Sequence, residues 1–151
     1  MGGDAHGLQL HHGMQVYVTV AATNRLGVTK RFVSNPVSID HTPPLAAFVK
    51  EIDITSPDSS SDVDLTLNST LRIVWSFSDA ESGLQWCDVA VGHAPGLTDV
   101  VPFTPAVMGS EVASALTLSA LNLSHGVTYY ATVKCANFAD LGELLGVGAV
   151  L

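Results

Sequence analysis

The stretch TLRIVWSFS at residues 70–78 decides the fold. Its large apolar side chains recur at every second position: Leu71, Ile73, Trp75 and Phe77. Successive side chains of a β-strand point to opposite faces, whereas a helix would scatter these four around its surface. β-branched and aromatic residues also favour strands. The stretch therefore predicts a strand with one face buried in an apolar core.

Other parts of the chain show the same alternation of apolar and polar residues. They are residues 16–22, 84–91, 116–123 and 126–137. Turn-forming residues lie between such stretches, at 57–59, 82–83, 95–96 and 102. No segment shows a helical period. Many short strands separated by turns predict an all-β fold, an antiparallel β-sandwich.

An internal repeat sets the domain organisation. Residues 8–24 recur at residues 121–137, which is 113 residues later, and eight of the 17 positions are identical. The repeated residues include a His-Gly pair, His12-Gly13 and His125-Gly126, and a final asparagine. A Leu-Gly pair follows each copy, but two residues later in the second. This offset predicts an insertion that displaces Gly142.

A period of 113 residues fits one sandwich of about 100 residues plus a linker. We therefore expect residues 1–40 to be the C-terminal part of a truncated repeat, residues 41–44 a Pro-rich linker, and residues 45–151 a sandwich that lacks the usual ending. The first part is too short to close a sandwich, so it is expected to form at most a two-stranded hairpin. Residues 142–151 are expected to supply the last strand.

Composition excludes several classes of function. Hydrophobic residues make up 47% and charged residues 13% of the 151 residues, which is enough to build a core. The net charge of -8 argues against nucleic acid and anionic membrane as partners. No run of 18 apolar residues predicts a membrane-spanning helix, and the N-terminus lacks the pattern of a signal peptide.

Two groups of residues resemble the fibronectin type III pattern. Trp75 stands at the centre of its strand, and a later strand has a tyrosine followed by alternating apolar residues and an asparagine: Tyr129, Ala131, Val133, Cys135 and Asn137. The resemblance implies an immunoglobulin-like sandwich with Trp75 in the core. It also implies that Tyr129 forms a tyrosine corner, in which the hydroxyl reaches the backbone upstream. Cys135 departs from the usual alanine, and the first copy has Val16 in place of the tyrosine.

A finer match is to repeats of extracellular multidomain proteins. It rests on Asp62-Val63-Asp64, the segment 77–83, the segment 92–96 and the linker Asp40–Pro44. The match implies an extracellular, non-catalytic structural or adhesion module of a larger secreted or membrane-anchored protein, with a protein as its partner. The alternatives are a ligand-binding receptor ectodomain, including a calcium-dependent one, and an accessory module of an extracellular enzyme.

The resemblance places residues 84–91 and 126–137 side by side in one sheet, with Cys87 and Cys135 facing inward. Opposed residues of an antiparallel pair have Cα atoms about 4.5–5.5 Å apart, within the range of about 4.4–6.8 Å that a disulfide spans. An oxidising compartment favours the bond. The alternative is two buried free thiols.

Sequons for N-glycosylation occur at Asn68 (Asn68-Ser69-Thr70) and at Asn122 (Asn122-Leu123-Ser124). Asn122 precedes an expected turn, where a glycan would be accommodated.

Acidic loop residues are candidate calcium ligands: Asp62, Asp64, Asp79 and Glu81, with Asp99 as a further candidate. Asp79 and Glu81 can instead shape the turn beside Gly83. No nucleophile, zinc or phosphate-binding motif occurs, so the chain is not expected to be an enzyme. His12 and His125 occupy equivalent positions and are expected to share a structural role.

Trp86 and Tyr130 fall on the outward side of their expected strands. They are candidates for one exposed aromatic interaction face, and the alternative is cross-strand packing that stabilises the sheet.

Overall fold

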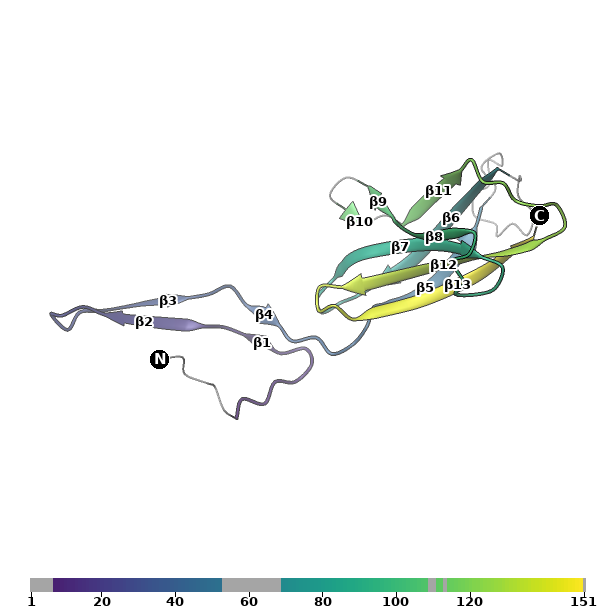
Figure 1. Ribbon diagram of the computed structural model, residues 1–151. Coiled ribbons are helices and arrows are strands. Elements are labelled where there is room, and N and C mark those ends of the chain that lie inside the picture. The colour runs from purple at the N-terminus through teal and green to yellow at the C-terminus, as the bar shows by residue number, and fades with distance from the viewer. Residues whose placement is uncertain (1–6, 53–68, 109–110, 113, 151) are drawn as a thin grey trace. The chain divides into compact units, whose positions relative to one another are not determined.

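A computed structural model describes residues 7–52, 69–108, 111–112 and 114–150 of the chain. The chain separates into two compact units, Met1–Thr42 and Pro43–Leu151. No helix occurs among these described residues (Figure 1). The all-β prediction is therefore confirmed.

The described residues of the second unit form nine strands: β5 (Leu45–Glu51), β6 (Thr70–Ser78), β7 (Leu84–Gly92), β8 (Val101–Pro105), β9 (Val107–Met108), β10 (Glu111–Val112), β11 (Ala115–Ser119), β12 (Thr128–Asn137) and β13 (Gly142–Val150). They form a three-stranded sheet in the order β11-β6-β5, a four-stranded sheet in the order β13-β12-β7-β8, and a small β9–β10 hairpin. Every pairing is antiparallel. The two larger sheets lie in separate layers (Figure 1), as in a β-sandwich.

The apolar core lies between these two sheets. The alternating face of β6 is buried as predicted, and Ile73 and Trp75 are 0% and 3% exposed. Val89 of β7 and Val133 of β12 face it from the four-stranded sheet and belong to the same buried cluster. Each fully buried side chain of this size stabilises the fold by about 1.5–3 kcal/mol. The hydrophobic period of the sequence therefore corresponds directly to the core.

The strand expected over residues 116–123 ends early. β11 stops at Ser119, and Ala120 has a positive φ of 57°, which an extended strand cannot contain. Leu121 nevertheless packs against the core and Leu123 is buried. Apolar alternation predicted burial here correctly, but it could not detect the left-handed residue that ends the strand.

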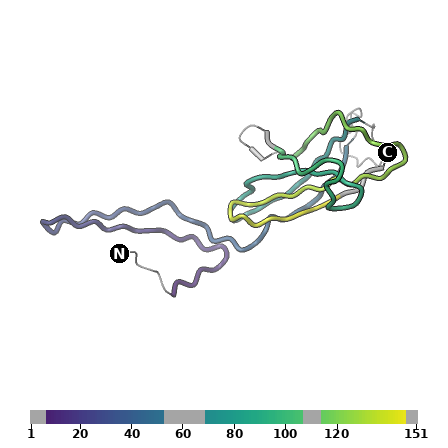
Figure 2. The backbone as a smooth tube through the Cα atoms, in the orientation of Figure 1, coloured from purple at the N-terminus to yellow at the C-terminus, as the bar shows by residue number. Residues whose placement is uncertain are grey.

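The first unit is a β-hairpin ribbon, as the sequence predicts. β2 (Thr19–Thr23) pairs with β3 (Thr29–Val33), and the short β1 (Gln15–Val16) pairs with β4 (Val37–Ser38). The register shifts by one residue between the two ladders, where the Ser34 hydroxyl accepts the Val18 backbone N–H at 3.0 Å. The two halves of this ribbon run side by side (Figure 2). We call β2–β3 the first hairpin, and β12–β13 the closing hairpin.

Candidate functional site

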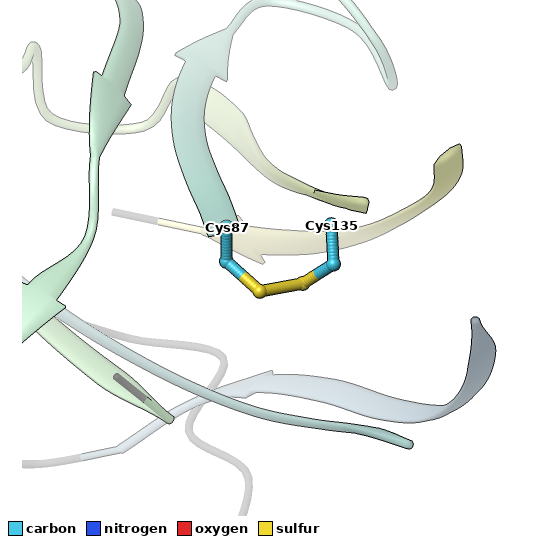
Figure 3. The surroundings of a disulfide bond; sticks show 2 residues. All are labelled: Cys87 and Cys135. Carbon is cyan, nitrogen blue, oxygen red and sulfur yellow. A yellow bond between two sulfur atoms is a disulfide. The ribbon is translucent and has the colours of Figure 1, made fainter. Parts of the chain in front are cut away.

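The most specific predicted feature, a bond between Cys87 and Cys135, is present as a disulfide (Figure 3). The two residues are directly opposed in the β7–β12 ladder, with Cα atoms 4.1 Å apart. The Cys87 carbonyl accepts the Ala106 backbone N–H at 2.9 Å, so its backbone groups point away from β12. This is the close, non-hydrogen-bonded type of pair, which brings side chains together. Both cysteines are buried, and the bond joins the two central strands of the sheet.

The two hairpins share one turn geometry. The Asn24 carboxamide oxygen accepts the backbone N–H groups of Leu26 and Val28, at 2.9 and 3.0 Å. The Asn137 carboxamide oxygen likewise accepts those of Ala139 and Leu141, at 3.1 and 2.9 Å. Each donor lies two or four residues beyond its asparagine. The repeated asparagine therefore builds the same turn in both units.

The insertion predicted before Gly142 is wrong. Thr23 pairs with Thr29 in the first hairpin and Ala136 with Gly142 in the closing hairpin, so the two loops have equal length. The residue with positive φ is Gly27 in one loop, at 82°, and Asp140 in the other, at 60°. The repeated Leu-Gly pair misled because Asp140 takes the left-handed position that glycine usually fills.

The turns that enter the two hairpins are also equivalent. The Met14 N–H donates to the His11 carbonyl, and the Val127 N–H donates to the Ser124 carbonyl, three residues upstream in each case. Gly13 and Gly126 have positive φ angles of 79° and 76°. His12 and His125 thus stand before the same left-handed glycine in each unit.

Tyr129 makes the contact implied by a tyrosine corner. Its hydroxyl accepts the Ser124 backbone N–H at 3.0 Å, and its ring is buried. The first unit has Val16 at this position, and the equivalent His11 N–H donates to the Met14 thioether sulfur at 3.3 Å instead. A different side chain therefore satisfies the same backbone donor in the first unit.

Asp79 organises the β6–β7 turn. One of its carboxylate oxygens accepts the backbone N–H groups of Ser82 and Gly83, both at 2.8 Å, and the other accepts the Asn137 side-chain amide at 3.0 Å. Desolvation raises the pKa of Asp79, but the hydrogen bonds from Asn137, Ser82 and Gly83 outweigh it, so the pKa lies below its usual value. Asp79 thus ties two loops of the second unit together.

Two of the calcium candidates within the described residues have other partners: Asp79 holds the β6–β7 turn, and Asp99 pairs with a histidine. Asp99 lies beside His93, with Oδ2 2.7 Å from Nδ1 of the imidazole. Hydrogen bonds from the His93 side chain and backbone lower the pKa of Asp99. Asp62 and Asp64 lie outside the described residues. The calcium site stays a prediction.

A loop that sequence analysis overlooked covers part of the outer face of the four-stranded sheet. The backbone N–H of Gly96 donates to the Thr132 hydroxyl at 3.0 Å, and Thr132 is buried although its strand position faces outward. A Cβ atom on Gly92 would lie 2.5 Å from the Leu97 carbonyl oxygen, so only glycine permits this close approach. The glycine and proline of segment 92–96 were the available signal.

Asn122 is exposed, whereas the next residue, Leu123, is buried and anchors the segment. The sequon is therefore held at the surface in a non-helical loop. Asn68 lies outside the described residues, and glycosylation at both positions stays a prediction.

Trp86 and Tyr130 do not form one aromatic face. Trp86 is opposite Ala136, and Tyr130 is opposite Gly92, at the other end of the ladder. Six residues of strand separate them, which is about 20 Å. The Trp86 ring instead lies beneath Lys134, with Nζ 5.5 Å from the ring centroid. This contact is cross-strand packing of the kind expected as the alternative.

Among the described residues, no helix is long and apolar enough to cross a membrane. No known family, curated protein or solved structure matches the chain. The disulfide agrees with an oxidising environment.

Proposed function

We propose that the chain is a non-catalytic extracellular module of the fibronectin type III-like class, acting as a spacer or adhesion repeat in a larger protein. The observation that carries this proposal is the repeated hairpin. Two segments 113 residues apart have the same register and the same asparagine-centred turn. Tandem copies of one unit are typical of proteins that span distance or present several binding surfaces.

The strand order supports the fibronectin type III-like class. A three-stranded sheet faces a four-stranded sheet, and Trp75 lies on the central strand of the three-stranded sheet. The Tyr129 hydroxyl accepts a hydrogen bond from the Ser124 backbone N–H, upstream in the chain. The disulfide supports the extracellular part of the proposal, because such bonds persist in oxidising compartments. The exposed sequon at Asn122 points the same way.

The proposed mechanism is spacing by ordered units joined through a stiff linker. Pro43 and Pro44 restrict the backbone and cannot donate hydrogen bonds. Just before them, Asp40 accepts both the backbone N–H and the hydroxyl of Thr42, each at 3.0 Å. Both features reduce the freedom of the chain between the units.

Expression through a secretory pathway tests the compartment. The full chain fused to a signal peptide should be secreted with the Cys87–Cys135 bond formed and a glycan on Asn122. Mass spectrometry before and after glycosidase treatment would detect the disulfide and the glycan. Asn122→Gln is the control, which should lose the glycan but keep the disulfide. Retention in the cell with reduced cysteines would contradict the proposal.

Spin labels placed at Thr19 and at Arg72, one in each unit, test the spacing mechanism. Both positions are exposed. A narrow distance distribution is expected, and the double variant Pro43→Gly and Pro44→Gly should broaden it. A distribution equally broad in both proteins would remove the spacer role.

A further inference from the structure

The first hairpin presents an apolar face to solvent. Val20 and Phe32 are directly opposed in the β2–β3 ladder and are 55% and 54% exposed, and nearby Val18 is 62% exposed. Exposed apolar residues that are clustered in this way, rather than scattered, mark interaction surfaces.

The repeat identifies the interface to which this face corresponds. Val133 and Leu145 form the equivalent opposed pair of the closing hairpin, where Val133 is fully buried and Leu145 packs against the core. Likewise, Ala22 is equivalent to Cys135. The apolar face of the first hairpin is therefore the face that, in the closing hairpin, completes a sandwich.

Charge favours a partner that resembles the second unit. Residues 7–39 contain Arg25, Lys30 and Arg31 and no acidic residue. All but two of the 14 acidic residues of the chain, Asp4 and Asp40, lie in residues 43–151. A basic hairpin and an acidic unit attract each other at long range, whereas two basic hairpins repel.

We propose that the first hairpin is an interchangeable copy of the closing hairpin. Its apolar face binds the unit 43–151 of a second copy of this chain. Binding occurs when β12–β13 of that second copy have left their place in the sheet. The incoming β2 would pair with the exposed edge of β7, and Val20 would take the place of Val133. This is hairpin donation, a form of β-strand addition. In the oxidised chain the Cys87–Cys135 bond holds β12 in that position.

A disulfide trap tests the proposal on the full chain. In the double variant Ala22→Cys, Cys135→Ala, a hairpin in the proposed register brings the thiol introduced at position 22 opposite Cys87. Oxidation in a glutathione buffer should then yield dimers linked through these two positions, detected on a non-reducing gel and by mass spectrometry of the linked peptides.

The matched control moves the introduced thiol by one residue. Ala21 is equivalent to the outward-facing Lys134, so the double variant Ala21→Cys, Cys135→Ala should give at least about tenfold less linkage to Cys87. Equal linkage in the two variants, none in either, or linkage confined to monomers would overturn the proposal.

A second pair of variants covers the case in which loss of Cys135 prevents folding. Ala22→Cys and Ala21→Cys alone keep the natural cysteines, so Cys87 can choose between two partners. At redox equilibrium, the Ala22→Cys chain should form a dimer linked between position 22 and Cys87. This dimer should be more abundant than the dimer that the Ala21→Cys chain forms between position 21 and Cys87. Adding Val20→Asp and Phe32→Asp should abolish that excess, and an unchanged excess would count against the apolar face.

Discussion

The first hairpin and the closing hairpin have the same local structure but different surroundings. They share their register, their asparagine-centred turn and the left-handed position within it. They differ in the burial of the face that carries Val133 in the closing hairpin and Val20 in the first hairpin. Val133 is fully buried, whereas its equivalent Val20 is more than half exposed. Local sequence therefore determines the hairpin geometry, and tertiary burial determines how much that geometry contributes to stability.

This difference is large on the scale of protein stability. A two-stranded hairpin alone is at best marginally stable in water, whereas burial of each large apolar side chain contributes about 1.5–3 kcal/mol. Both tryptophans, Trp75 and Trp86, lie in the second unit, so tryptophan fluorescence reports on its unfolding alone.

Removal of the disulfide should have the largest effect. The bond closes a loop with a sequence separation of 48 residues, and constraint of the unfolded chain by such a loop is worth about 4 kcal/mol. Cys87→Ala with Cys135→Ala should lower the free energy of unfolding by about this amount in urea titrations. Ala22→Ser, at the equivalent position of the first hairpin, is the control and should leave the transition unchanged. A loss below about 1 kcal/mol would contradict the chain-constraint argument.

Truncation of the equivalent valines measures burial directly. Val133→Ala should cost about 2–3 kcal/mol, since it leaves a cavity in the core. Val20→Ala should change the free energy of unfolding by less than about 0.5 kcal/mol, because the side chain is already in water. Urea titrations followed by tryptophan fluorescence measure the effect of Val133→Ala, and amide hydrogen exchange within the first hairpin measures the effect of Val20→Ala. Equal effects would mean that the two hairpins do not differ in burial.

The two turn asparagines separate local from tertiary contributions. Asn137→Ala should cost about 2 kcal/mol, because it orphans two backbone donors and removes the bond to Asp79. Asn24→Ala should not move the fluorescence transition, but it should speed amide hydrogen exchange at Leu26 and Val28. Protected amides at those two positions would show that the side chain of Asn24 does not hold the turn.

Acid titration isolates the contact between Asp79 and the turns. Because the folded-state pKa of Asp79 is depressed, its contribution to stability is present above the ordinary aspartate pKa, near 3.8, and is lost as the pH falls through the folded value. The wild type should therefore lose stability below about pH 4 more steeply than Asp79→Asn. The measurement is the urea midpoint between about pH 2 and pH 7. Parallel curves would exclude this role for Asp79, and the effect should be smaller than that of Asn137→Ala.

The sequence predicted the parts of the structure that depend on simple periodicity. Alternation over residues 70–78 identified the core strand. The disulfide prediction, with two free thiols as its alternative, needed both the inward parity of Cys87 and Cys135 and the resemblance that placed their strands side by side. The sequence did not predict that segment 93–99 would fold over Thr132, because that contact depends on long-range packing. It also placed Trp86 beside Tyr130 incorrectly, since parity gives the face of a residue but not its position along the neighbouring strand.

The turn at residues 137–141 was misread for a related reason. Sequence comparison aligned the glycines that follow each copy, but the backbone aligns Gly27 with Asp140. Aspartate can adopt the left-handed conformation, although at a cost that glycine avoids.

Exchange of these two residues should have the smallest effect. Asp140→Gly should stabilise the second unit by about 0.5 kcal/mol, because relief of backbone strain is partly offset by the greater freedom of glycine in the unfolded chain. Asp140→Ala is the matched control and should shift the urea midpoint the opposite way. The reciprocal Gly27→Asp strains the backbone but meets no neighbouring atom, since none lies within 4 Å of a Cβ built there. Its effect should therefore be confined to faster amide exchange in the first turn. If Asp140→Gly destabilised the unit, the aspartate would have to contribute more than backbone conformation, and the two turns would be equivalent in geometry but not in energy.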